Sequence, residues 1–232
     1  MYAISLTSIP PRLPRIGPVL ESLLAQRPAP EAVYLCLPYR WERFGEYAGA
    51  LDVPEGVVVH MSLVDWGPAM KVIPLANDPQ FKAQKLIYCD DDWIYPTGWA
   101  AALLAASLPS LAVAASGFNV DRLKRLGVYP GPDFVEVAQG FGGVCVDPVW
   151  MRRPEVSPPE NAKLADDIWL SGQLAQQRVP IRLCQQAREG LVPAFEDRHG
   201  LQDLDVPGQR RAEANAAALD ALTQRYGIWP EL

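Results

Sequence analysis

The chain has 232 residues, of which 49% are hydrophobic, and this length is enough to bury one substantial core. We therefore predict a single domain over residues 1–232. The formal net charge of -6 argues against a general nucleic-acid-binding protein, because such proteins need an excess of Lys and Arg to displace phosphate counterions. We expect a small-molecule partner and no nucleic acid.

The first residues contain no basic segment followed by an apolar stretch, so the sequence predicts no secretory signal and a cytoplasmic protein. The four cysteines form no CxxC pair and lie in apolar, strand-like runs; they are Cys36, Cys89, Cys145 and Cys184. We expect buried, reduced thiols instead of a zinc site or disulfides.

Short apolar runs alternate with helical or loop-like segments through the first half of the chain. The predicted strands cover residues 2–6, 32–37, 57–61, 85–89 and 111–115. Because these runs are almost continuously apolar, they indicate central strands of a mainly parallel sheet with helices on both faces. The predicted class is α/β and Rossmann-related, with ligands at the carboxyl ends of the strands.

Residues 93–120 carry no charge before Asp121 and are rich in Ala and Leu, which imitates a membrane span. Pro96, Pro109 and several serines divide the stretch into a helix and a short buried strand. We therefore expect a protein that is not an integral membrane protein.

The second half of the chain is less regular. We predict strands at 134–138, 143–146 and 179–184, a helix at 161–177, and a polar, Ala-rich helix at 209–226 on the outside of the domain. No low-complexity linker separates these elements.

The strongest chemical signal is the triplet Asp90, Asp91, Asp92 at the end of a predicted buried strand. Three adjacent carboxylates repel one another and need a compensating charge, and oxygen ligands select a hard divalent ion such as Mg²⁺ or Mn²⁺. The alternative is a solvated acidic turn. The flanking aromatic residues, Tyr88 and Trp93 among them, favour the metal site.

A hydrophobic strand, a DxD motif and then Trp93-Ile94-Tyr95-Pro96 together resemble the donor site of GT-A-fold glycosyltransferases of the family 2 type. The resemblance implies that Asp90, Asp91 and Asp92 bind a nucleotide-sugar donor and that Asp90 and Asp92 hold its metal ion. It also implies a nucleotide-binding half, 1–92, and an acceptor-binding half, 93–232.

Two upstream segments are similar to further parts of such donor sites. Residues 66–71 resemble a GPxxK segment, which implies that Lys71 approaches the nucleotide or its phosphates; the alternative is a turn with Lys71 in solvent. The exit of the first strand, residues 7–12, implies donor contacts from Thr7 and Arg12, unless Arg12 is an ordinary surface cation. No glycine precedes Gly17, which counts against the Gly-rich phosphate loop of nucleotidyltransferases.

Residues 140–143, Gly-Phe-Gly-Gly, resemble the loop that lines the donor sugar and acceptor, which makes Gly142 and Gly143 donor-binding candidates; a simple bulge is the alternative. Asp166 and Asp167 open the helix at 161–177. Their order after the glycine loop resembles inverting GT-A enzymes, which implies that Asp167 is the general base, with Asp166 beside it. Adjacent helical residues point roughly 100° apart, so only one can aim into the cleft. A stabilising acidic helix start is the alternative.

Of the two histidines, His199 is a candidate metal or diphosphate ligand by the same resemblance, and its role stays open. His60 lies inside a predicted strand and is expected to be structural.

The predicted function is metal-assisted transfer of a sugar from a nucleoside-diphosphate sugar to an acceptor hydroxyl, with inversion. The acceptor can be a glycan, a lipid-linked molecule or a small molecule. Two other classes remain open: a magnesium-dependent nucleotidyltransferase or phosphotransferase, and a non-catalytic nucleotide- or carbohydrate-binding protein of the same fold.

Overall fold

The computed structural model describes residues 1–232 except 129–130, 154–155 and 196–210. Its strands are β1 (Tyr2–Leu6), β2 (Val33–Pro38), β3 (Val57–Ser62), β4 (Lys85–Tyr88), β5 (Trp93–Ile94), β6 (Ala112–Ala114), β7 (Gly117–Phe118), β8 (Phe134–Val135), β9 (Val137–Ala138), β10 (Val144–Val146), β11 (Ile181–Leu183) and β12 (Val192–Pro193).

The α-helices are α1 (Gly17–Leu24), α2 (Ile73–Ala76), α3 (Trp99–Ala106), α4 (Asp166–Ala175) and α5 (Arg211–Tyr226). Short 3₁₀ helices connect them: η1 (Leu13–Arg15), η2 (Gly67–Lys71), η3 (Val120–Leu123), η4 (Gly140–Gly142), η5 (Pro148–Met151), η7 (Glu160–Ala162) and η8 (Gln185–Arg188).

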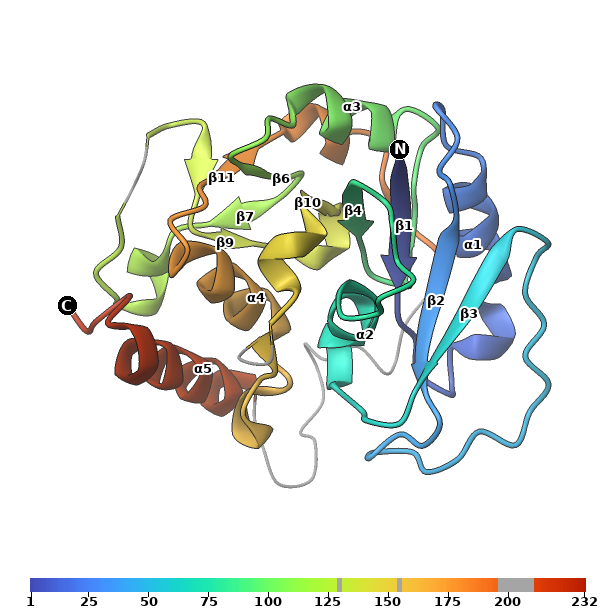
Figure 1. The fold of residues 1–232 in the computed structure, drawn as a ribbon, viewed down its shortest axis with the longest axis horizontal. Coiled ribbons are helices and arrows are strands. Elements are labelled where there is room, and N and C mark those ends of the chain that lie inside the picture. The colour runs from blue at the N-terminus through green and yellow to red at the C-terminus, as the bar shows by residue number, and fades with distance from the viewer. Residues whose placement is uncertain (129–130, 154–155, 196–210) are drawn as a thin grey trace.

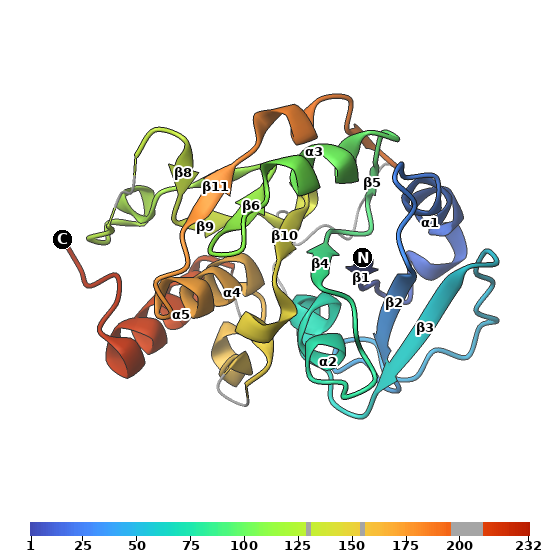
Figure 2. The same ribbon diagram turned by 45° about the horizontal axis from the view of Figure 1, so that its top comes forward.

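The main sheet has eight strands in the order β3-β2-β1-β4-β10-β6-β11-β8. Strands β10 and β8 run antiparallel to their neighbours, and the other six share one direction. The sheet crosses the molecule from β3, near one end, towards β8 on the side of the C-terminus (Figures 1 and 2). The predicted α/β class with a mainly parallel sheet is confirmed.

Helices cover both faces of the sheet because its central strands are apolar on both sides. One face packs Ile4 and Leu35 against α1 and α3, and the opposite face packs Ala3 and Leu86 against η2, α2 and α4. In Figure 1, α2 and α4 lie in front of the sheet and α1 lies behind β2. The division into halves at residue 92 stays a prediction, while the sheet itself is continuous across it.

The antiparallel strand β10 determines where the glycine loop lies. Its first residue, Val144, pairs with Tyr88, the last residue of β4. Because the two strands run in opposite directions, the segment that enters β10 meets the segment that leaves β4 at one edge of the sheet. Residues 140–143 therefore lie beside the aspartate triplet.

Two predictions for the second half were wrong in detail. Residues 134–138 do not form one strand: β8 pairs with β11 in the main sheet, and β9 pairs with β7 in a separate ribbon. Between them, the Glu136 carboxylate turns to the backbone and accepts a hydrogen bond from the N–H of Val120. The helix predicted at 161–177 begins only at Asp166, because 3₁₀ helix η7 and a short connection occupy its first residues.

The C-terminal helix packs as predicted. Helix α5 lies along α4 (Figure 2) and buries Ala214, Ala218 and Leu222 against it. Leu222 contacts the position of Gly172 so closely that a Cβ there would overlap its side chain.

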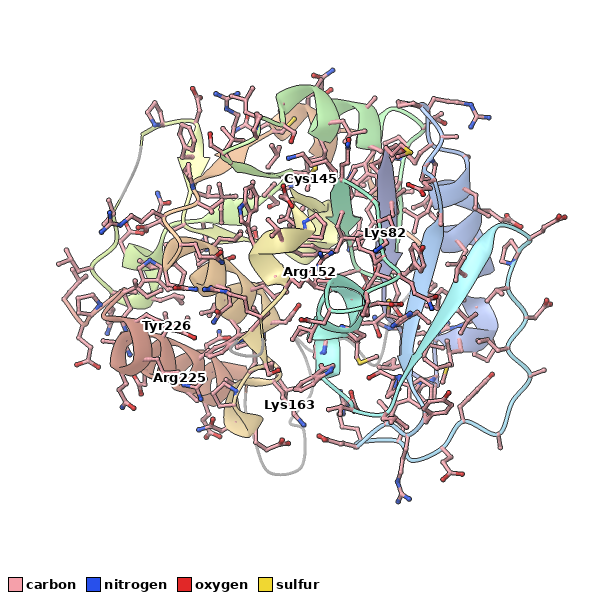
Figure 3. All side chains as sticks on the ribbon, viewed as in Figure 1. Lys82, Cys145, Arg152, Lys163, Arg225 and Tyr226 are labelled. Atoms are coloured by element: carbon pink, nitrogen blue, oxygen red, sulfur yellow. The ribbon has the colours of Figure 1, made fainter. Side chains whose placement is uncertain are left out.

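The uncharged stretch divides into α3 and β6, as predicted. Within the described part of the chain, no helix is both long and apolar enough to cross a membrane. The four cysteines are free thiols; Cys36, Cys89 and Cys145 are buried, and Cys184 is half-buried. Cys145 lies within β10 (Figure 3).

Candidate active site

A pocket of about 500 Å³ opens at the carboxyl ends of β1 and β4. It gathers eight of the predicted site residues: Thr7, Arg12, Lys71, Asp90, Asp91, Asp92, Asp166 and Asp167. These residues come from four separate segments of the chain. The convergence of the triplet and the acidic pair on one pocket is the arrangement that the sequence predicted.

The middle aspartate of the triplet is held by side chains. Asp91 is 4% exposed and accepts hydrogen bonds from the Ser8 hydroxyl and the Arg12 guanidinium. Burial raises the pKa of Asp91, although Arg12 and Ser8 counteract this. A solvated acidic turn is therefore excluded.

Arg12 is also no ordinary surface cation. It is 9% exposed, and its second nitrogen lies 3.2 Å from Asp92 Oδ2. Through these contacts Arg12 bridges two aspartates of the triplet. Its guanidinium is engaged with the protein, so its effect on a bound diphosphate acts largely through the position and charge of Asp91 and Asp92.

Lys71 joins the two acidic clusters. Its ammonium lies 2.5 Å from Asp90 Oδ1 and 2.8 Å from Asp166 Oδ2, and its side chain is 3% exposed. Burial alone lowers the pKa of Lys71, but Asp166 and Asp90 raise it well above its ordinary value. The turn with a solvated lysine is excluded, and Lys71 is a permanent cation between the clusters.

Asp167 also lines the pocket, but its hydrogen-bond partner is a neutral backbone N–H and not a cation. Its Oδ1 accepts a hydrogen bond of 2.9 Å from the backbone N–H of Gly140. Burial and the neighbouring Asp166 raise the pKa of Asp167 to about 7, although Lys71 opposes this. A carboxylate with a pKa near neutrality suits a general base, because it can take a proton and release it at physiological pH.

Both acids of the pair line the pocket, but they differ in their partners. Asp166 is directed to Lys71, whereas Asp167 is directed to Gly140. This agrees with the expectation that adjacent helical positions take different roles.

In the glycine loop, Gly142 and Gly143, the two predicted donor-binding residues, contact Trp99. The Gly142 carbonyl accepts a hydrogen bond from the Trp99 indole N–H, at 2.7 Å. Gly143 has a φ of +93°, and a Cβ there would overlap the Trp99 ring, so this glycine is required for packing. The loop residues that line the pocket are Gln139 and Phe141.

Gly140 is the glycine of this loop that lies against Lys71 and Asp90. A Cβ at this position would overlap the Lys71 ammonium and lie 2.8 Å from Asp90 Oδ1. The absence of a side chain therefore lets Lys71 approach Asp90 while the Gly140 N–H reaches Asp167.

The two histidines are placed differently. His199 lies outside the described residues, so its role as a metal ligand stays a prediction. His60 lies in β3, with Nδ1 3.7 Å from Asp78 Oδ2.

The sequence predictions missed several side chains of the pocket. They are Ser8, Trp41, Phe44, Trp93, Phe141 and Arg188, among others. Ser8 lies within residues 7–12, and Trp93 directly follows the aspartate triplet. Both could have been proposed because they are close in the chain to predicted site residues. Arg188, about 96 residues beyond the triplet in the chain, carried no such signal, because only the fold brings it to the site.

Asp90 and Asp92 are the carboxylates available to a metal ion. Their side chains are 35% and 27% exposed, compared with 5% for Asp91. Over the described ranges, no group of three His, Cys, Asp or Glu residues is spaced to hold a metal ion. Two carboxylates together with substrate phosphates form a common ligand set for Mg²⁺, so the residues present fit a metal that binds together with its substrate.

Comparison with solved structures found similarity to several chains, among them three crystal structures of S. aureus TarS. The crystal structures of TarS 1–349, TarS, and TarS 1–349 in complex with UDP have 14%, 12% and 13% identity to this chain and TM-scores of 0.47, 0.48 and 0.46. Each covers 78% of this chain, which spans 57%, 35% and 57% of those chains, less than two thirds of each. No protein-family model matches this chain, and no significant match was found among curated proteins.

Proposed function

We propose that this protein is a glycosyltransferase that uses a nucleoside-diphosphate sugar donor and a divalent cation, Mg²⁺ or Mn²⁺. One observation carries the proposal: an acidic triplet and an acidic pair, 74 positions apart from Asp92 to Asp166, converge on a single buried lysine in one pocket. The first cluster suits a metal-bound diphosphate, and the second suits a proton acceptor.

The pocket has the two surfaces that a nucleotide needs. Trp41, Phe44 and Ile9 line one part of it, and aromatic and apolar side chains provide the contact area for a flat base. Asp90 and Asp92 lie at the end of β4, where the diphosphate binds in this proposal. Thr7, which directly follows β1, lines the same pocket.

Asp90 and Asp92 would hold the cation, which when bound neutralises charge on the diphosphate leaving group. Arg12 fixes Asp92, and Lys71 fixes Asp90. These two cations keep the carboxylates oriented before the donor arrives, so that little reorganisation is needed on binding.

In the transfer step, Asp167 takes the proton from the acceptor hydroxyl. The Gly140 N–H orients its carboxylate, and the pKa of about 7 that burial and Asp166 produce matches the strength needed of a base at neutral pH. A base that activates the acceptor directly supports single displacement, with inversion at the sugar carbon. His199 stays a candidate further ligand of the metal or the diphosphate.

The two alternative classes of protein differ from a glycosyltransferase in the products that they form and in the residues that they require. A nucleotidyltransferase or phosphotransferase would form pyrophosphate or transfer phosphate without a sugar acceptor. A non-catalytic binding protein would have no use for a base, whereas Asp167 is positioned by the loop beside the triplet. The position and environment of Asp167 favour the transferase.

The proposal is tested by thermal unfolding with a panel of nucleoside diphosphates and nucleotide-sugars, each with and without Mn²⁺. Ligands that bind the native state raise its melting temperature, and we expect a metal-dependent rise for at least one nucleoside diphosphate. Asp92→Asn removes a metal ligand and should abolish this rise. The matched control is Asp52→Asn, which changes an exposed aspartate and should leave the rise unchanged.

If no diphosphate stabilises the wild-type protein in a metal-dependent manner, the proposed function is wrong. Stabilisation that persists in Asp92→Asn would place the metal elsewhere and contradict the role assigned to the triplet.

A further inference from the structure

Next to the aspartate triplet, two aromatic rings and one arginine form a continuous part of the pocket wall. The rings of Trp93 and Phe141 have centroids 5.4 Å apart and planes inclined at 38°. The guanidinium carbon of Arg188 lies 5.5 Å from the Phe141 centroid. All three residues line the pocket, and we refer to them as the aromatic platform.

The platform is held by surrounding structure. The Tyr95 hydroxyl donates hydrogen bonds to the carbonyls of Asp90 and Phe141, at 2.9 and 3.2 Å, which fixes the Phe141 backbone beside the triplet. Strand β5, which contains Trp93, pairs with β12. That pairing brings the segment following η8 alongside the triplet, where the Ala194 N–H donates to the Asp92 carbonyl at 2.8 Å.

Arg188 differs from Arg12 and Lys71, the two cations that contact the aspartate triplet. Arg12 and Lys71 are buried and engaged with carboxylates. Arg188 is exposed, and no described residue forms an ion pair with it. An exposed guanidinium packed on an aromatic ring presents its remaining N–H donors to solvent, in the planar arrangement that suits a carboxylate or a phosphate.

The position of the platform relates it to the acceptor. Phe141 directly follows Gly140, whose N–H binds Asp167, and Trp93 directly follows Asp92. The two rings, the proposed base and the proposed metal ligands therefore line one pocket.

We propose that the acceptor is an anionic carbohydrate whose sugar ring packs on Phe141 and Trp93 while its carboxylate or phosphate pairs with Arg188. The apolar C–H face of a sugar ring packs on aromatic faces, and neighbouring polar groups set its orientation. The arginine favours a negative group, because its planar guanidinium suits a carboxylate or a phosphate. This inference rests on the proposed function, since it names the substrate of the same site.

The experiment measures binding of small acceptor probes by ligand-observed NMR, without any transfer reaction. The probes are methyl glucuronide, glucose 6-phosphate, the neutral methyl glucoside, and acetate and inorganic phosphate as anions without a ring. We expect one of the two acidic sugars to bind at least about tenfold more tightly than the glucoside, as a single charge-assisted contact allows. Which of the two binds more tightly identifies the acidic group.

Arg188→Gln should remove this preference, and Arg188→Lys should restore part of it. Phe141→Ala should weaken the acidic and neutral sugars alike. The matched control is Arg122→Gln: Arg122 is exposed and lies 5.2 Å from the Phe118 centroid, so it reproduces the arginine–aromatic contact outside the pocket. Its substitution should leave sugar binding unchanged.

Equal binding of acidic and neutral sugars to the wild-type protein, no sugar binding at all, or an undiminished preference in Arg188→Gln would overturn the proposal. UDP with Mn²⁺ is measured by thermal shift in the same variants. If Arg188→Gln loses the UDP shift but keeps the preference for the acidic sugar, Arg188 belongs to the donor site and the acceptor inference fails while the proposed function stands. If UDP and every other diphosphate fail to shift the wild-type protein, the proposed function fails instead.

Discussion

The triplet at the end of β4 and the pair at the start of α4 are both acidic clusters, but they balance their negative charge differently. Asp90, Asp91 and Asp92 are contacted by two cations, Arg12 and Lys71. Among the described residues, the cation that contacts the pair is Lys71, which pairs with Asp166, and Asp167 accepts a hydrogen bond from a backbone N–H.

This difference separates the carboxylates that contact a cation from Asp167, which is the base in the proposed function. A fixed cation in contact with a carboxylate favours its ionised form, whereas burial with a like charge nearby favours the protonated form. Asp167 is in the second situation, and its pKa rises to about 7. Aspartates of the same pocket can therefore have different roles, because each has a different interaction partner.

The strongest test of the contrast removes the proton acceptor. In Asp167→Asn we expect transfer to fall by about 10²–10⁴-fold, the usual contribution of general base catalysis. Donor binding should persist, because the triplet and its cations are untouched. The measurement compares kcat with the metal-dependent thermal shift by the donor diphosphate, and retained transfer would remove Asp167 as the base.

A second test removes the cation that the two clusters share. Lys71→Met leaves Asp166 and Asp90 without their counter-charge, and breaking a buried ion pair by removing one partner costs about 3–5 kcal/mol of the free energy of unfolding. Because Asp90 is partly exposed, most of this cost comes from Asp166. Urea denaturation measures it.

Lys163 provides the matched control for Lys71. It also contacts two carboxylates, Glu42 at 2.6 Å and Glu160 at 2.7 Å, but those are exposed; Lys163 is labelled in Figure 3. Lys163→Met should cost only about 0–1 kcal/mol, as surface pairs do. Similar losses in the two variants would show that the buried bridge adds no more than a surface one.

A third test uses the pH dependence of activity and stability. Below pH 7 Asp167 is protonated and cannot accept a proton, so kcat/KM should rise about tenfold per pH unit up to about pH 7 and then level. For stability the sign is opposite: a carboxyl whose folded pKa is raised binds more protons when folded, so its contribution declines as pH rises from about 4 to about 7.

Asp167→Asn should remove this decline in stability, which is measured by denaturation at several pH values. A decline that is unchanged in Asp167→Asn would assign the raised pKa to another group. An activity profile that is flat between pH 5 and pH 7 would contradict the role of Asp167 as the base.

The sequence was sufficient for the strands because parallel strands buried on both faces leave continuous apolar runs, as in β1 and β4. Predictions from the sequence were less reliable where tertiary contacts interrupt a segment that its sequence pattern favours. The break at Glu136 depends on a hydrogen bond to Val120, and the late start of α4 depends on η7.

The same limit applies to the site. The triplet and Asp167 were visible because carboxylates are unusual beside apolar runs. The burial of Lys71 was not predictable, because a lysine is solvated unless partners far along the chain enclose it. Gly142 and Gly143 looked like pocket residues, but the Gly142 carbonyl binds the Trp99 indole and the missing side chain of Gly143 accommodates the Trp99 ring. Only the folded chain distinguishes these uses.

The contacts of Ser8 and Arg12 with Asp91 have a consequence for substitutions at these three positions. In a bare DxD pattern the middle position is free to vary, whereas here Asp91 is the counterion of Arg12 and the acceptor for Ser8. Loss of Asp91 alone leaves a buried guanidinium without its main partner, and loss of Arg12 alone leaves a buried carboxylate. The side chains at positions 8, 12 and 91 are thus coupled, so that replacing one of them alone should cost more stability than replacing all three together.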